Sequence, residues 1–239
     1  MKRLTFSGFN GRDFLAPLIK SLRFFPNLRA LQLKKLNIDE RDQCTLQYDS
    51  SQDAKTIELD VISLTPAVAA TLGRLLSELS SLQELELTGL DVDRSILQAE
   101  EMEALFGEFN KTVALYRLTF KGFSVGGCLF PLFRSFRFFP NLVQLELQRL
   151  NVDEHDLRGL LESFQFIPNL ERLDLSGNPL GHAITSIVPH VINLKKLRYL
   201  SINNTGSSEE DFNFVRDTVH QALPALHFEE FDFWYDSDD

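Results

Sequence analysis

The sequence contains few cysteines, few tryptophans and no long apolar run. Among 239 residues there are two cysteines and one tryptophan. Cys44 and Cys128 lie far apart and form no cluster at either end, whereas secreted domains are often closed by disulfides, so the cytosol is the expected compartment. No run of about 18 apolar residues and no charged leader ahead of an apolar segment occurs, so we expect neither membrane insertion nor a signal peptide.

The sequence also lacks the motifs of catalysis and of cofactor binding. None of the five histidines belongs to an H-E-x-x-H pattern, and no C-x-x-C pair occurs. His182 and His190 are eight residues apart, a spacing that favours a surface or core pair over a metal site. Glycine-rich phosphate loops are missing as well. We therefore expect no enzyme activity, no cofactor and no bound metal.

The most informative feature that is present is an internal duplication. Residues 3–42 return as residues 117–156, without a gap and with more than half of the positions identical. Within each copy the apolar residues follow the spacing L-x-x-L-x-L-x-x-L, and this frame recurs along the whole chain. Neighbouring frames are 26 to 33 residues apart, and a constant period of this kind indicates a repeat array. The frames begin at Met1, Leu28, Ala54, Leu82, Leu115, Leu142, Leu170, Leu197 and Leu223.

Each frame predicts a short strand followed, in most units, by a helix. The alternation of Leu31 and Leu33 with polar residues is typical of a strand with one buried face. The Thr65-Pro66 pair predicts a helix start, as do Asp153 and the capping-box spacing of Ser207 with Glu210. The chain is thus predicted to be a single α/β domain over residues 1–239, a solenoid with a parallel concave sheet, convex helices and about nine repeats.

Two units depart from this pattern, and the ends of the chain differ from each other. Residues 37–54 are rich in serine and aspartate, which favours a loop or one short turn. The 33-residue unit, which contains residues 98–112, predicts a longer helix and a small insertion. Because Met1 already lies in a strand frame without a preceding cap, we expect the chain to be a C-terminal fragment of a larger protein.

Candidate binding residues lie on the predicted concave face. With strands about 4.8 Å apart, side chains at equivalent frame positions form columns. The middle column reads Thr5, Gln32, Glu58, Glu86, Thr119, Glu146, Asp174, Ser201 and His227. It carries four carboxylates and no lysine or arginine, although the flanking columns add both signs of charge. The candidate ligand-binding residues are Glu58, Asp60, Glu84, Glu86, Glu146 and Asp174.

A net charge of −10 favours a basic or mixed-charge protein partner and disfavours nucleic acid. A solvated polar sheet without a binding role is an equally simple interpretation of the middle column.

Phenylalanine is unusually common, with 21 copies. Phe24, Phe25, Phe138 and Phe139 occupy equivalent places in the two copies of R-F-F-P-N-L, which predicts core packing at the corner between helix and strand. A second aromatic group ends the chain and predicts either a hydrophobic cap or a docking surface. This possible second surface consists of Phe231, Phe233, Trp234 and Tyr235.

The period of about 28 residues, the frame of residues 170–180 with its Asn178, and the missing cysteine caps resemble the leucine-rich repeats of the ribonuclease-inhibitor subclass. They are similar to the C-terminal repeats of intracellular NLR-type immune receptors. That resemblance implies a cytoplasmic sensor and autoinhibitory module that binds a protein ligand or other domains of its receptor. A free-standing inhibitor or scaffold is the alternative. A GTPase-activating protein of this repeat class is a further alternative. It requires an arginine-containing active surface, and neither Arg41 nor Arg94 carries enough signal to be nominated for it.

Overall fold

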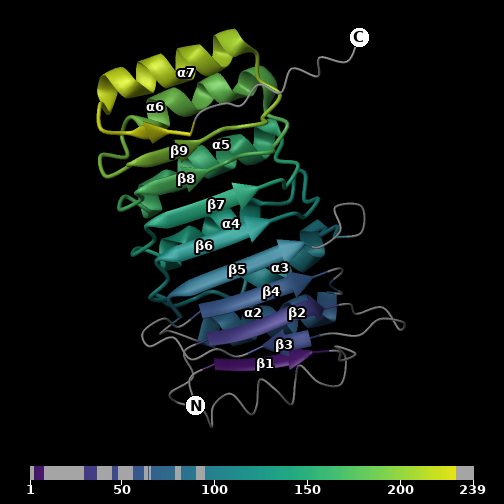
Figure 1. The fold of residues 1–239 in the computed structure, drawn as a ribbon. Coiled ribbons are helices and arrows are strands. Elements are labelled where there is room, and N and C mark those ends of the chain that lie inside the picture. Colours follow the sequence, from purple (N-terminus) through teal and green to yellow (C-terminus); the bar gives the residue numbers. More distant parts are fainter. Residues whose placement is uncertain are drawn as a thin grey trace, which may run out of the picture.

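The computed structural model describes residues 3–7, 30–36, 45–47, 56–61, 64, 66–78, 82–89 and 95–229. The described chain is α/β, with one ten-stranded sheet whose strands stack into an elongated body (Figure 1). The strands are β1 (Arg3–Ser7), β2 (Ala30–Leu36), β3 (Thr45–Gln47), β4 (Thr56–Val61), β5 (Glu84–Gly89), β6 (Arg117–Lys121), β7 (Gln144–Gln148), β8 (Arg172–Asp174), β9 (Tyr199–Ser201) and β10 (His227–Phe228).

Every neighbouring pair from β4 to β10 is parallel. The parallel pairs β1–β2 and β2–β4 continue the sheet towards the N-terminus. The exception is β3, which runs antiparallel to both β1 and β2. Residues 45–47 were expected to be loop or turn, and this expectation was wrong, because Thr45 and Leu46 pair with the edge of the sheet. The remainder of residues 37–54 lies outside the described residues.

The described helices lie on one side of the sheet, behind it in Figure 1, and leave its other face open. This arrangement is consistent with the expected solenoid. Several helices end in a 3₁₀ turn or are replaced by one, which shortens the path back to the next strand. The helical elements are α2 (Pro66–Glu78), α3 (Ala99–Phe106), α4 (Phe130–Ser135), η1 (Phe136–Phe138), α5 (Glu154–Ser163), η2 (Phe164–Phe166), η3 (Gly181–Ile187), α6 (Val188–Val191) and α7 (Glu209–Ala222).

The helix starts agree with the sequence at two places and differ at a third. Pro66 opens α2, while its expected cap Thr65 lies outside the described residues. Asp153 caps α5 as predicted, since its Oδ1 accepts a hydrogen bond of 2.8 Å from the backbone N–H of Asp156. The predicted Ser207 cap of α7 was wrong by one residue. The Ser208 hydroxyl oxygen caps this helix by accepting a hydrogen bond from the backbone N–H of Asp211. The cap therefore lies one residue later than predicted.

The 33-residue unit does not contain the longer helix expected from its length. Helix α3 has 8 residues, fewer than the 13 of α2. It begins after Gln98, whose backbone N–H donates to the Glu101 side chain at 2.9 Å. The helix ends at Gly107, and the extra residues form the connection that leads to β6. Length alone was misleading, because the added residues lengthen a loop.

The last frame is displaced by two residues from its predicted place. His227 pairs with Tyr199 and Phe228 with Leu200, whereas the frame headed by Leu223 placed His227 beside Ser201. The helix α7 runs through Ala222, and four residues, with a turn at Pro224 and Ala225, separate it from the strand. His227 therefore belongs to the first column of the sheet face.

The core consists of the frame leucines together with phenylalanines from the corners. Leu145, Leu173 and Leu200 are adjacent in the sheet and fully buried. Phe139 is also fully buried and meets Phe109 edge-on at 5.0 Å between ring centroids, which confirms the predicted core role of this residue. Phe24 and Phe25 lie outside the described residues.

One buried asparagine joins two neighbouring repeats through its side chain. The Oδ1 atom of Asn178 accepts from the N–H groups of Leu150 and Val152, at 2.9 and 3.3 Å. Its Nδ2 donates to the carbonyls of Leu147 and Leu175, both at 2.7 Å. All hydrogen-bonding positions of this fully buried amide are thereby used, which fixes the turn after β7 against the turn after β8.

Within the described residues, no helix combines the length and the apolar character that a membrane crossing requires. The longest described helix, α7, has 14 residues and begins with three acidic side chains. Its buried residues, Phe212, Val215 and Val219, form a single stripe that packs on the neighbouring repeat. The pattern is that of an amphipathic helix covering a core.

Candidate recognition surface on the open sheet face

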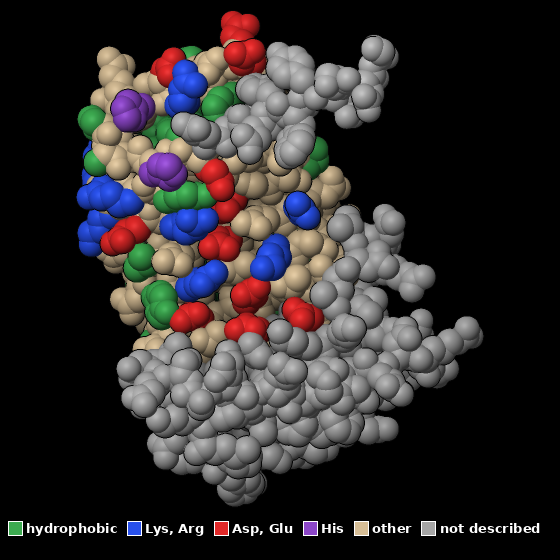
Figure 2. Space-filling view, in the orientation of Figure 1, with side chains coloured by type: hydrophobic (Ala, Val, Ile, Leu, Met, Phe, Trp, Pro, Cys, Tyr) green, Lys and Arg blue, Asp and Glu red, His purple; other side chains and the backbone are tan. Residues whose placement is uncertain are grey.

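The register brings the predicted middle column together across β4 to β9. Glu58 pairs with Glu86, Glu86 with Thr119, and Thr119 with Glu146, and the column continues through Asp174 to Ser201. Figure 2 views this face and shows acidic and basic side chains interleaved over it. From Glu58 to Ser201 the column exists as the sequence predicted, whereas His227 does not belong to it. Its electrostatic character differs, because the carboxylates have partners from the columns beside them.

Glu146 and Asp174 are both largely buried, with 9% and 3% of their surface exposed. Arg172 lies between them, with its Nε 3.3 Å from Glu146 and its Nη2 3.7 Å from Asp174. Arg117 approaches Glu146 from the other side at 3.6 Å. Asp174 also accepts from the Gln148 amide at 2.7 Å. These two carboxylates are therefore engaged within the sheet.

The other candidate carboxylates also have neighbours on this face. Glu86 accepts a hydrogen bond of 2.6 Å from the Lys121 ammonium group, and the two side chains are about one third exposed. Glu84 accepts from the Tyr116 hydroxyl. Burial, together with this bond to Glu84, raises the pKa of Tyr116 to about 12. Glu58 and Asp60 lie on β4, half-buried, next to Glu86 and Thr88.

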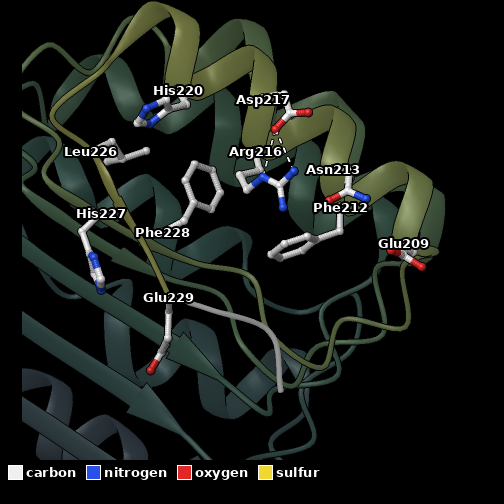
Figure 3. A pocket seen from close by; sticks show the side chains of 10 residues that line it. All are labelled: Glu209, Phe212, Asn213, Arg216, Asp217, His220, Leu226, His227, Phe228 and Glu229. Atoms are coloured by element: carbon white, nitrogen blue, oxygen red, sulfur yellow. Dashed lines mark hydrogen bonds and ion pairs between the residues drawn. The ribbon is translucent and has the colours of Figure 1, made fainter. Parts of the chain in front are cut away.

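A stack of cationic and aromatic side chains forms a feature that the sequence reasoning missed. The Arg172 guanidinium carbon lies 3.5 Å from the centre of the Tyr199 ring, and Tyr199 lies 5.6 Å from His227. We call Arg172, Tyr199 and His227 the aromatic ladder. Figure 3 shows the His227 ring projecting from β10. The first column is formed by the first residue of each strand and includes Gln144, Arg172 and Tyr199. A list of this column would have revealed Arg172 and Tyr199, but not His227, because the last frame was predicted two residues away from its true place.

Glu229 closes the C-terminal end of this surface. Its carboxylate accepts hydrogen bonds from Ser201 and Tyr199, which together with Arg172 hold its pKa below the usual value. Burial and the bond to Glu229 raise the pKa of Tyr199 to about 12. Ser201 also bonds Ser176, with 2.5 Å between the hydroxyl oxygens. The acidic residue next to Ser201 is therefore Glu229, in the column where the sequence placed His227.

The second predicted surface lies outside the described residues, because Phe231, Phe233, Trp234 and Tyr235 all follow residue 229. The structure does describe a hollow of about 570 Å³ between α7 and β10 (Figure 3). Phe212 and Phe228 point into this hollow, with their ring centroids 6.4 Å apart. The hollow thus has an apolar floor at the end of the described array.

The described surroundings of His182 and Cys128 are those of ordinary surface and partly buried side chains. His182 contacts Asp211, with 2.7 Å between Nδ1 and Oδ1, on the exposed side of α7. Burial raises the pKa of the Cys128 thiol, and nearby carboxylates raise it further, which opposes nucleophilic activation. In the ranges that the structure describes, no three histidine, cysteine or acidic side chains are grouped as a metal site would require.

Comparison with known proteins adds no identification. No protein-family model matches the chain, and no curated protein matches it. The candidate surface is therefore defined by geometry, as the open sheet face from β5 to β10. Its most distinctive part is the aromatic ladder together with the arginine-bridged carboxylates Glu146 and Asp174.

Proposed function

We propose that this chain is a protein-recognition module, a leucine-rich-repeat solenoid that serves as the sensor and autoinhibitory domain of a cytosolic NLR-type immune receptor. The repeated frame and the sheet with helices on one side support the repeat class. The receptor role is the one that the sequence resemblance implies. No catalytic group is required for it, since such a module acts by binding.

The observation that carries a binding role is the aromatic ladder on the open sheet face. Arginine and tyrosine are enriched among the residues that dominate protein–protein binding energy. Tyr199 and Arg172 are partly exposed and already stacked, so little conformational entropy is lost when a partner covers them. A merely solvated sheet would not need this preorganisation.

The charges on this face favour a mixed-charge protein partner, which can be another domain of the same receptor. Arg172 bridges Glu146 and Asp174, and Arg117 adds a second cation at Glu146. Arg117, Lys121 and Arg172 keep about one third or more of their side chains exposed. A uniformly basic partner would meet these cations directly. The sequence left a basic and a mixed-charge partner open, and these contacts support the mixed-charge alternative.

The proposal is tested by affinity capture from cytosolic extract with three immobilised proteins. They are the wild type, a sheet-face variant with Arg172→Gln and Tyr199→Leu, and a convex-face variant with Arg158→Gln and Phe166→Leu. Each variant changes one arginine and one exposed aromatic residue, so the two are matched in chemistry. Thermal melting of all three verifies that each is folded.

We expect proteins retained by the wild type and the convex-face variant to be lost from the sheet-face variant. Loss from the convex-face variant instead would place recognition on the helices. Sequencing of the transcript upstream of the Met1 codon tests the receptor context separately. A nucleotide-binding domain encoded there supports the NLR assignment, whereas a complete short reading frame favours the free-standing inhibitor or scaffold.

A further inference from the structure

A polar groove of about 850 Å³ crosses the carboxyl ends of β5 to β9. Its walls are formed by strand ends and the turns that follow them, a position where parallel α/β sheets often bind ligands. The groove adjoins the open face but is centred on other residues than the aromatic ladder. Its charged and amide groups come from Lys121, Gln148, Arg149, Asp174, Asn203, Asn204 and Glu229.

Most charged groups along this groove are already paired. Asp174 is bound by Gln148, by the N–H of Ser176 at 3.0 Å and by Arg172. Lys121 is bound to Glu86. Arg149 differs, because its side chain is exposed and makes no ion pair or hydrogen bond within the described part of the chain. The groove therefore presents one guanidinium group with unused donors.

Arg149 also has an unfavourable backbone conformation, with a φ of 52°. Equivalent positions in neighbouring repeats hold Gly122, Gly177 and Asn204, the residue types that tolerate this left-handed region. The conformation is imposed by backbone hydrogen bonds that repeat from one unit to the next. The N–H of Gly122 donates to the carbonyl of Gln148, and the N–H of Arg149 donates to the carbonyl of Ser176. Arginine is thus a costly choice at a position where glycine would fit.

The next repeat is shaped to accommodate this arginine. A Cβ atom on Gly177 would lie 2.6 Å from the Cγ of Arg149, closer than real side chains approach. The stem of Arg149 therefore lies directly across the backbone of Gly177. The strained backbone of Arg149 and the missing side chain of Gly177 in the next repeat together hold the guanidinium group over the groove. Folding alone does not require this arrangement.

We propose that Arg149 binds a carboxylate from an acidic segment of the partner protein, seated in this groove. This inference rests on the proposed recognition function and adds the partner's chemistry at one end of the surface. The planar guanidinium fork matches a carboxylate with two parallel hydrogen bonds. Asp174 and Glu229 also line the groove, so a singly charged carboxylate is repelled less than a doubly charged phosphate group.

The test measures binding of a short fluorescein-labelled glutamate oligopeptide by fluorescence anisotropy. The proteins are the wild type, Arg149→Gln, and Arg158→Gln as a control with the same loss of charge on helix α5. We expect Arg149→Gln to weaken binding on the order of tenfold, and Arg158→Gln to leave it unchanged. A glutamine oligopeptide should bind much more weakly than the glutamate one. Equal binding by the wild type and Arg149→Gln overturns the proposal.

Two further measurements test whether the bound anion is a carboxylate and whether the backbone strain at Arg149 serves binding or the fold. Tighter Arg149-dependent binding of a phosphoserine oligopeptide than of the glutamate one would overturn the choice of carboxylate. Arg149→Gly should lose binding like Arg149→Gln yet melt about 2 °C higher, because glycine relieves the left-handed strain. A lower melting temperature for Arg149→Gly would instead show that the arginine serves the fold.

The chain's own acidic end is the remaining competitor. If Arg149→Gln melts lower than Arg158→Gln, and removing residues 236–239 abolishes that difference, the occupant is that segment and the partner assignment fails. The capture experiment separates this inference from the proposed function. If Arg149→Gln retains every captured protein at wild-type strength, carboxylate binding by Arg149 is refuted while the proposed recognition function stands. If captured proteins are lost only from the sheet-face variant, the result likewise refutes the role of Arg149 and leaves the proposed function standing.

Discussion

Replacement of Asn178 by alanine should be among the most destabilising polar substitutions in this protein. The side chain satisfies the N–H groups of Leu150 and Val152 and two carbonyls, all inside the buried turn region. In Asn178→Ala the two N–H groups lose the acceptor that the structure gives them. At about 1–3 kcal/mol for each unsatisfied buried group, the expected loss is about 4 kcal/mol.

Chemical denaturation monitored by circular dichroism measures this loss, with a melting temperature lower by roughly 10 °C as a second readout. Thr205 supplies the matched control, since it occupies the equivalent place one repeat later. Its hydroxyl makes one hydrogen bond of 3.0 Å to the carbonyl of Ile202 and a weaker contact to Ser207. Thr205→Val should therefore cost about 1 kcal/mol. Equal costs for the two variants, or a cost below about 1 kcal/mol for Asn178→Ala, would refute the bridging role.

Four further outcomes follow from the packing and the charge pairs. Leu173→Ala removes a fully buried frame leucine and should cost about 2–5 kcal/mol in denaturant titration, and a cost below about 0.5 kcal/mol would contradict the frame. Gly73→Ala should cost about 1–3 kcal/mol, because its new Cβ would lie 2.2 Å from the backbone oxygen of Ala104 in α3, and an unchanged melting temperature would contradict this close approach. The raised pKa values of Tyr116 and Tyr199 mean that the folded state retains these phenol protons, so their contribution to stability is present below about pH 10 and is lost as the pH rises towards about 12. Phenylalanine at both tyrosine positions should flatten this alkaline decline in melting temperature, and an equally steep decline in the double variant would contradict it. Glu146→Lys should lower the melting temperature by placing a buried ammonium group beside two arginines, and a stable, fully folded variant would show that these ion pairs are dispensable.

The sequence predicted the strands well because each frame carries the same physical constraint. Alternating leucines such as Leu145 and Leu147 must be buried, and the polar residue between them must then face outwards. A shift by one residue would expose the leucines, so the register is strongly specified. The start of β10 escaped prediction because Leu223 and Leu226 are both buried without forming the strand, and the pattern alone does not distinguish the turn from the frame.

The helix side was less predictable, because several solutions satisfy the same burial. The 33-residue unit needs only a few apolar contacts from Met102, Leu105 and Phe106 to cover its part of the core. A short helix with a longer connection supplies these contacts as well as a long helix does. Likewise, Ser207 and Ser208 are both suitable caps, and only the detailed path of the preceding turn selects Ser208.

The candidate surface shows what residue types alone leave open. The sequence identified the column containing Glu86, Glu146 and Asp174, but the effect of these charges depends on side-chain reach across the strands. Arg172 contacts carboxylates in two repeats, Glu146 and Asp174, which a column-by-column count treats as independent. Pairing of this kind is visible only when distances are known, and it shows that a partner meets these carboxylates together with their arginines.

The chain's net charge of −10 must then act away from the centre of the sheet face. The first turns of α3, α5 and α7 are acidic, with Glu100, Glu154 and Glu209 among their residues. Carboxylates at these places interact favourably with the positive ends of the helix dipoles, so they stabilise the helices whether or not a partner is present. The long-range field can still attract basic partners, while the contact face selects by stacked aromatic and mixed-charge groups. Net charge therefore acts on the encounter of the two proteins, and contact chemistry acts on their docking. The aromatic ladder contributes to docking only.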